Sequence, residues 1–264
     1  MRRSGFTLIE LLVVIAVTSL LLAVLMASLQ RSRRLAKAVR CGSNVKQLVL
    51  GLALYETENQ TFPHSLHESF VEEPPGGFAG DPVFDRAGWW WFNHITDYSR
   101  TQLHRVSVLW CPSRELRDPR LRRNVLCGSY GVNESVCKRS SGSESRWEFV
   151  GRPLCTGDVW RSSETLLIMD SGYSTITWWH ATDAPPTALG STREDMAYVP
   201  GLWINEDKDI WPGQELDAFG GRHPNKTVNV GFVDGHTDRV RADDLFVEKV
   251  DDVYRNQSPL WVPR

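Results

Sequence analysis

The sequence predicts an α+β protein in which a long amino-terminal helix, first transmembrane and then amphipathic, packs on an antiparallel β-sheet head. Three patterns predict this class. Residues 11 to 29 contain no charged side chain, apolar residues beyond them recur at helical spacing, and short alternating segments bounded by Gly and Pro follow. The chain has 264 residues, 41% of them hydrophobic, so it is long enough to bury a sizeable core.

The uncharged segment is long enough to span a membrane. At about 1.5 Å per residue it makes a helix of roughly 28 Å, close to the thickness of a hydrocarbon core. A cleaved secretory signal would need a shorter apolar region and small residues at its cleavage site. A plain signal anchor fits the length but leaves Glu10 unexplained, because a carboxylate deep in lipid costs roughly 2.5 kcal/mol or more without a partner.

The stretch RRSGFTLIELLVVIAV, residues 2 to 17, resembles the leader of type IV prepilins. That family has a short basic leader ending in glycine, then phenylalanine, and a glutamate at the fifth position of the mature chain. The resemblance implies that prepilin peptidase cuts between Gly5 and Phe6 and methylates the new amino group of Phe6. It also implies a single-pass protein of the cytoplasmic (inner) membrane, with the carboxyl-terminal head outside the cytoplasm, in the periplasm or at the cell surface.

The predicted domain organisation follows from these observations. It comprises a prepilin leader (1–5), a transmembrane helix (6–29), an amphipathic continuation of that helix (30–60) and an exported α+β head (61–264).

A cut after Gly5 gives Glu10 a role. It leaves a cationic α-amine at the membrane face, close to Glu10 along the helix. When such helices bundle in a filament, Glu10 of one subunit can neutralise the amine of its neighbour, and this fixes the register because a mis-docked subunit leaves buried charges uncompensated. The simpler interpretation is that Glu10 only reaches toward the membrane interface.

The helix is predicted to continue beyond the membrane, because apolar residues at positions 45, 48, 49 and 52 keep helical spacing. We expect it to run from about residue 6 to residue 55, with a possible break at residues 42–44 and a stop before Pro63.

Two further segments resemble a large group of prepilin-like proteins abundant in Planctomycetes. The first is CGSNVKQLVLGLALYETENQTFP, which begins at Cys41. The second lies near the carboxyl terminus, where that group has a histidine, a spacer of nine residues and Asp-Gly. Here ten residues separate His223 from Asp234, and this difference leaves the relative facing of the two side chains open.

Several segments of the head carry strand or turn signals. Residues 228–233 alternate, Asp234-Gly235 is a hairpin turn signal, and HTDRV begins the returning strand. Residues 106–113 read as a short strand ended by Pro112. The remaining predictions are a buried strand and loop at 88–95, strand or turn elements at 128–135 and 164–174, and loops at 72–82 and 141–145.

Two candidate metal sites emerge from the head. His223, Asp234 and His236 have the donor types that suit zinc or manganese. The simpler interpretation is that Asp234 bonds its own backbone in the turn and that His223 hydrogen-bonds loop backbone beside the hairpin.

Asn205, Asp207 and Asp209 alternate as a calcium loop begins, but Ile210 and Leu216 stand where an EF-hand has glycine and glutamate. A looser calcium loop of the kind found in some secretion pseudopilins stays open, and a solvated acidic loop is the simpler interpretation. We therefore expect no cofactor, with calcium as the open alternative.

Composition limits the remaining classes. The net charge of −2 gives no basic surface that would indicate nucleic acid binding. The 11 tryptophans fit either a contact surface or a Trp-rich core, and the core is the simpler interpretation. Five cysteines allow one or two disulfides in an exported head and leave at least one thiol unpaired.

The sequence therefore predicts a non-enzymatic type IV pilin-like or type II secretion pseudopilin-like subunit. Its expected partners are prepilin peptidase, other pilin or pseudopilin subunits and the lipid membrane. Two alternatives stay open. One is a membrane-tethered receptor for a glycan or protein that uses the leader only for export, and the other is a metal-dependent enzyme built on His223, Asp234 and His236.

Overall fold

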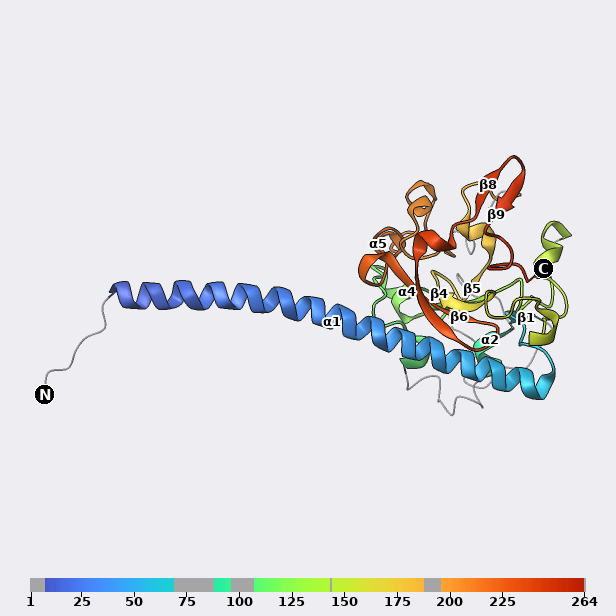
Figure 1. Ribbon diagram of the computed structural model, residues 1–264, viewed down its shortest axis with the longest axis horizontal. Helices are drawn as coiled ribbons and strands as arrows, with labels where there is room; N and C mark the ends of the chain where they lie inside the picture. Colours follow the sequence, from blue (N-terminus) through green and yellow to red (C-terminus); the bar gives the residue numbers. More distant parts are fainter. Residues whose placement is uncertain (1–7, 69–87, 96–106, 143, 188–195, 264) are drawn as a thin grey trace, which may run out of the picture.

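A single helix, α1 (Leu8–Asn59), forms the amino-terminal fifth of the protein and reaches far beyond the head (Figure 1). The computed structural model describes residues 8–68, 88–95, 107–142, 144–187 and 196–263. The helix does not break at residues 42–44, and it ends four residues later than predicted. Gln60 follows it with a positive φ of 62°, a conformation that stops a helix.

The two halves of α1 have different surroundings. Apolar side chains from Leu8 to Leu29 are all exposed, whereas the second half packs on the head. The residues of α1 that the head buries are Ala38, Cys41, Asn44, Val45, Leu48, Val49, Gly51 and Leu52. Their spacing of three and four residues places them along one side of the helix, as the sequence predicted for 45, 48, 49 and 52.

A five-stranded sheet supports this docked half, in the order β5-β3-β4-β6-β7. The pairs β3–β4, β4–β6 and β6–β7 are antiparallel, and β3–β5 is parallel. The strands are β3 (Tyr130–Asn133), β4 (Leu166–Asp170), β5 (Thr175–Ile176), β6 (Thr227–Phe232) and β7 (Thr237–Arg241). The predicted α+β class is therefore confirmed, and so are the strands predicted at 128–135, 164–174 and 228–233.

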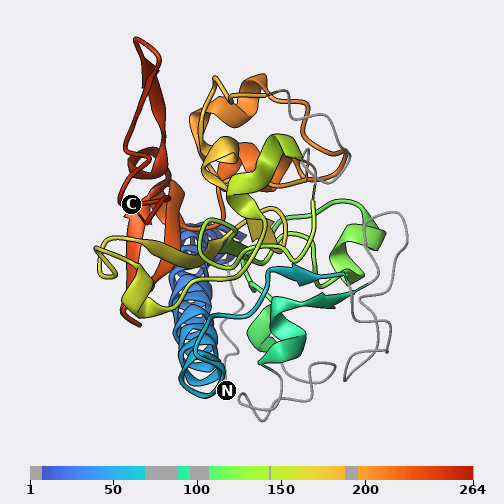
Figure 2. The ribbon, with the colours of Figure 1, turned by 90° about the vertical axis from the view of Figure 1, so that its right-hand side faces the viewer.

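Smaller elements surround the sheet, and most are single turns. Two two-stranded ribbons are formed by β1 (Leu66–His67) with β2 (Trp89–Trp90) and by β8 (Glu248–Val250) with β9 (Val253–Arg255). The β8–β9 ribbon extends away from the rest of the head (Figure 2). The short α-helices are α2 (Trp91–His94), α4 (Pro119–Arg123) and α5 (Glu215–Gly220). The 3₁₀ turns are η1 (Ser107–Leu109), η2 (Glu144–Phe149), η3 (Thr156–Asp158), η4 (Trp178–Ala181), η5 (Trp203–Asp207), η6 (Pro224–Lys226) and η7 (Ala242–Leu245).

The alternation of β6 assigns its two faces. Asn229 and Gly231 face α1, since a Cβ placed on Gly231 would lie 2.2 Å from Val49 Cγ2 and a Cβ on Gly42 would lie 3.2 Å from Asn229 Oδ1. Val228, Val230 and Phe232 lie in a second apolar cluster, together with Trp178, Trp179 and Trp261. The sheet is thus covered on both faces, by α1 on one side and by carboxyl-terminal segments on the other.

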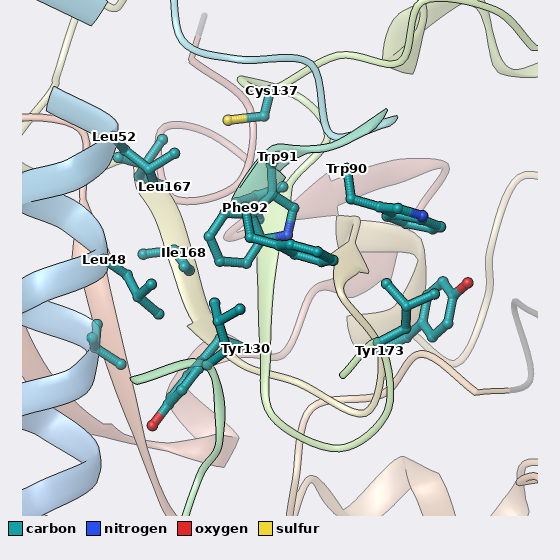
Figure 3. Packing of buried hydrophobic residues seen from close by; sticks show 14 of the residues in the cluster. Leu48, Leu52, Trp90, Trp91, Phe92, Tyr130, Cys137, Leu167, Ile168 and Tyr173 are labelled. Atoms are coloured by element: carbon teal, nitrogen blue, oxygen red, sulfur yellow. The ribbon is translucent and has the colours of Figure 1, made fainter. Parts of the chain in front are cut away.

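Tryptophans contribute to both apolar clusters, as the simpler interpretation of the composition predicted. Leu48 and Leu52 of α1 pack near Ile168 and Leu167 of β4, next to Trp91 and Phe92 (Figure 3). Trp147 and Trp160, however, are 74% and 73% exposed.

One predicted strand is wrong. From Ser107 onward the segment 106–113 forms the turn η1 and then runs beside α1 without a strand partner. Its polar backbone groups bond side chains instead, because Asn44 Nδ2 donates to the Trp110 carbonyl (3.2 Å) and the Cys111 amide donates to Ser129 Oγ (3.4 Å). Alternation alone could not reveal this replacement of a strand partner by side chains.

Two other predictions on the head have partial outcomes. Residues 88–95 form only a two-residue strand before α2, although Trp90, Trp91 and Phe92 are buried as expected. The predicted loop at 72–82 lies outside the described residues, as does position 143 of the predicted loop at 141–145.

Candidate functional site

The amino-terminal half of α1 is one candidate functional region. The large apolar side chains between Leu8 and Leu29 are between 45% and 80% exposed, and this helix is long and apolar enough to cross a membrane. Thr18 Oγ1 donates to the Val14 carbonyl (2.9 Å), so its hydroxyl group is satisfied within the helix. The region therefore presents an apolar surface that lipid or another copy of the helix can cover.

Glu10 lies in the first turn of α1, at the end farthest from the head. Gly5 and Phe6, between which cleavage is predicted, lie outside the described residues. Basic side chains follow the apolar region and extend into the start of the docked half, and they are all exposed: Arg31, Arg33, Arg34, Lys37 and Arg40. This order of apolar, basic and docked segments matches a helix that leaves a membrane and enters a head.

A buried polar cluster lies where α1 meets the sheet, and it consists of Cys41, Cys111, Asp170 and His223. Cys41 is on α1, Asp170 ends β4, and the other two residues come from the segments after η1 and before β6. One potential ligand atom from each residue lies within 4.8 Å of those of the other three. Cys41 Sγ is 3.4 Å from Asp170 Oδ1, and His223 Nε2 is 3.1 Å from Asp170 Oδ2.

Neighbouring polar groups orient this cluster. The backbone N–H of Asn229 donates to Asp170 Oδ2 at 2.7 Å, and its side-chain Nδ2 donates to the same oxygen at 3.0 Å. The Tyr130 hydroxyl lies 3.0 Å from Cys41 Sγ and accepts from Asn44 Nδ2 (3.1 Å). Such outer contacts hold donor atoms in place whether or not an ion is present.

The cluster shifts the pKa values of its own members. Burial opposes charge on Asp170, but the His223 imidazolium, Arg222 and the Asn229 amide together outweigh burial and lower the pKa of Asp170. Burial likewise disfavours the His223 cation, but the Asp170 carboxylate raises the pKa of His223 to about 9. Burial raises the pKa of Cys41 strongly. Burial also acts to raise the pKa of Cys111, but hydrogen bonding with Cys41 and His223 lowers it to about 6.

The structure separates the residues of the sequence-predicted site at His223, Asp234 and His236. His223 lies beside Thr227 at the start of β6 and contacts Asn229, whereas Asp234 follows the far end of that strand, so β6 keeps the two side chains apart. Asp234 Oδ1 instead accepts from the His236 amide (3.0 Å) and lies 2.6 Å from His236 Nδ1. The prediction that Asp234 bonds its own turn agrees with this geometry.

The prediction that His223 hydrogen-bonds loop backbone is wrong for its Nε2 atom. That atom pairs with the side chains of Asp170 and Asn229 instead. Antiparallel pairing of β4 with β6 brings these residues together. Asp207 and Asp209 are both exposed, and neither belongs to a potential metal cluster among the described residues. Calcium binding there stays the open alternative to a solvated acidic loop.

Sequence reasoning missed three members of the buried cluster. In the sequence, Cys41 marks only the start of a motif and Cys111 is one of five cysteines that could form disulfides. All five are free thiols in the structure. The sequence could have indicated that Asp170 is buried, because it is the last residue of the apolar run LLIMD. A carboxylate at the end of a fully buried strand needs a partner in the core.

The comparisons with known proteins bear only on the amino terminus. Residues 1–26 match a family model described as the prokaryotic N-terminal methylation motif. No curated protein and no solved structure matches the chain. The match supports a prepilin-type protein, which implies processing by prepilin peptidase, and together with α1 it fits a membrane-anchored, single-pass chain.

Proposed function

We propose that this protein is a type IV pilin-like or pseudopilin subunit that works by assembly. Prepilin peptidase cuts it between Gly5 and Phe6 and methylates Phe6. The mature chain stays in the cytoplasmic membrane through the first half of α1, with its head outside the cytoplasm. Subunits then pack through this half of the helix into a type IV pilus or a type II secretion pseudopilus.

One observation carries the proposal: the part of α1 that matches the methylation motif leaves its apolar side chains exposed and carries a single acid, Glu10. An apolar helix of this length is stable in lipid or in a bundle of similar helices. A carboxylate buried in lipid or in a helix bundle is stabilised by a nearby cation. The α-amine of a neighbouring mature subunit supplies one.

The finer assignment rests on sequence alone. Cys41 and the segment after it, together with the His223 to Asp234 spacing, resemble the prepilin-like group abundant in Planctomycetes, and we assign the chain to that group. A dedicated prepilin export route accounts for a head outside the cytoplasm despite the basic residues that follow the apolar segment.

Mass spectrometry of the amino terminus and an assembly assay test this function together. We expect the mature chain to begin at N-methylated Phe6. Glu10→Gln should lower the yield of cross-linked or sheared multimers by about tenfold, because it leaves the partner amine unpaired at a cost of roughly 1.4 kcal/mol or more. Glu58→Gln, which removes an exposed acid near the other end of α1, is the matched control and should assemble normally. An uncut chain, or equal assembly of both variants, would contradict the proposal.

A tethered binding protein is the second candidate, and the exposed Trp147 and Trp160 favour it. Arg161 lies over the Trp160 ring, 4.5 Å from its centroid, which holds an aromatic face on the surface of the head. Aromatic surfaces of this kind bind proteins or glycans. This candidate predicts normal processing, no loss of multimers in Glu10→Gln, and loss of ligand retention in Trp160→Ala.

We propose no catalytic role for the head. The residues that a metal-dependent enzyme would use are either buried together, as in the Cys41 cluster, or separated by β6. A catalytic metal keeps an open position for water or substrate, whereas these four donors are all buried.

A further inference from the structure

We propose that Cys41, Cys111, Asp170 and His223 bind one structural zinc ion that fastens α1 to the head. This site is distinct from the one considered from the sequence, since only His223 is shared. The inference is independent of filament assembly, because a tethered binding protein would need the same docked helix.

The distances between the donors carry the argument. In a tetrahedral zinc site with bonds of about 2.0 to 2.3 Å, the donor atoms lie about 3.3 to 3.8 Å from one another. The four donors here lie within 4.8 Å of one another, and Cys41 Sγ and Asp170 Oδ1 are 3.4 Å apart. Small side-chain adjustments therefore bring all four onto one ion.

The donor set selects the metal. Two thiolates, an imidazole and a carboxylate suit zinc, whereas calcium and magnesium take oxygen ligands. With both cysteines ionised and the histidine neutral, the ligands carry three negative charges, so a divalent ion leaves a net charge of −1. All four residues are buried, which leaves no open position and marks the site as structural.

The surroundings also fit a bound ion. His223 Nε2 lies 3.1 Å from Asp170 Oδ2, so the imidazole already points one ring nitrogen at another of the four donors. The contacts of Asp170 with Asn229 and of Cys41 with Tyr130 supply the outer-shell support that zinc ligands need.

A zinc ion at this point joins four segments that are distant in sequence: α1, the segment after η1, the end of β4 and the segment before β6. A link at this point matters because α1 transmits mechanical force to the head. Any force between a membrane-anchored or assembled helix and its head passes through the docked half of α1, and coordination adds a bond-like link there.

The test measures metal in the full-length protein purified in detergent without chelator. We expect about one zinc per chain by elemental mass spectrometry. Cys41→Ser and Cys111→Ser should each reduce zinc to background, and Cys155→Ser, which changes a partly exposed thiol outside the cluster, should retain it. Zinc retained in the first two variants would overturn the proposal.

If a cysteine variant fails to fold, cobalt substitution in the wild-type protein still tests the proposal. Wild-type protein exchanged into Co²⁺ should show a thiolate-to-cobalt charge-transfer band and the visible bands of tetrahedral cobalt. Two results would overturn the proposal: a metal-free folded protein with free thiols, or a metal-free protein in which Cys41 and Cys111 form a disulfide by peptide mapping.

Discussion

Arg222 shows how a single buried side chain can hold several segments of the head. Its Nε donates to Asp217 Oδ2 at 2.7 Å, while its two terminal nitrogens donate to the Ser129 and Ser171 carbonyls at 2.5 and 2.6 Å. Asp217 in turn accepts from the Tyr198 hydroxyl (2.9 Å). The guanidinium therefore satisfies acceptors from three parts of the chain next to the proposed zinc site.

Replacing Arg222 by lysine should destabilise the protein although the charge is kept. A lysine has one nitrogen and cannot reach all of these acceptors, so at least one buried carbonyl loses its partner. We expect the free energy of unfolding to fall by about 3 kcal/mol, measured by chemical denaturation in detergent.

The control is Arg120→Lys, because Arg120 forms an exposed ion pair with Asp118 and its side chain is 59% exposed. That change should cost less than about 0.5 kcal/mol. Equal effects of the two substitutions would contradict the role assigned to the Arg222 guanidinium.

At the scale of elements, the contact between α1 and β6 depends on glycine. Gly231 faces the helix, and its hydrogen in place of a side chain lets Val49 lie directly against the strand. Gly42 does the same on the helix side, opposite Asn229. A glycine at this position indicated a possible break at residues 42–44, but in the fold Gly42 permits the close approach of helix and strand.

Gly231→Ala should therefore weaken the docking of α1. The added methyl group would lie 2.2 Å from Val49 Cγ2 and 3.1 Å from Ile168 Cγ2, so the helix must move or the side chains must leave their rotamers. We expect a loss of about 1 to 3 kcal/mol in the free energy of unfolding, and Val49→Ala added to Gly231→Ala should recover part of it.

Gly220→Ala is the matched control, because a Cβ at Gly220 in α5 meets no atom within 4 Å. Its effect on stability should stay within about 0.5 kcal/mol. A neutral Gly231→Ala would show that α1 is not packed on β6 as described.

At the scale of the whole molecule, α1 is one continuous helix with two roles. Its first half stands clear of the head and its second half is part of the core (Figure 1). The described residues of the head contribute no cover to the apolar half, so that half must be covered by lipid or by other subunits.

Spin labels at Val24 and Leu50 test this continuity in the detergent-solubilised protein. Both positions are exposed, at 65% and 58%, and 26 residues separate them, so a straight helix places their backbones about 39 Å apart. Pulsed dipolar spectroscopy should give a narrow distribution near that distance. A broad or much shorter distribution would indicate a hinge between the two halves, as residues 42–44 alone suggested.

The helices and strands that depend on a local sequence pattern could be predicted from the sequence. The uncharged run to Leu29, the stripe at 45, 48, 49 and 52, and the alternation and turn signal around Asp234 each predicted an element that the structure contains. These signals are local because helix and strand periods arise within one segment. The strand predicted at 106–113 is wrong because alternation within a segment does not reveal its partner. That segment packs beside α1 and not beside a strand.

No local sequence pattern could have predicted the buried cluster. Cys41, Cys111, Asp170 and His223 are separated by 50 or more residues of sequence, and only the pairing of β4 with β6 and the docking of α1 bring them into one place. By itself the sequence determined the processing motif, the apolar helix and the main strands, because covalent order and periodicity carry that information. Tertiary structure alone decided which donors share a site, because long-range packing sets the distances between side chains.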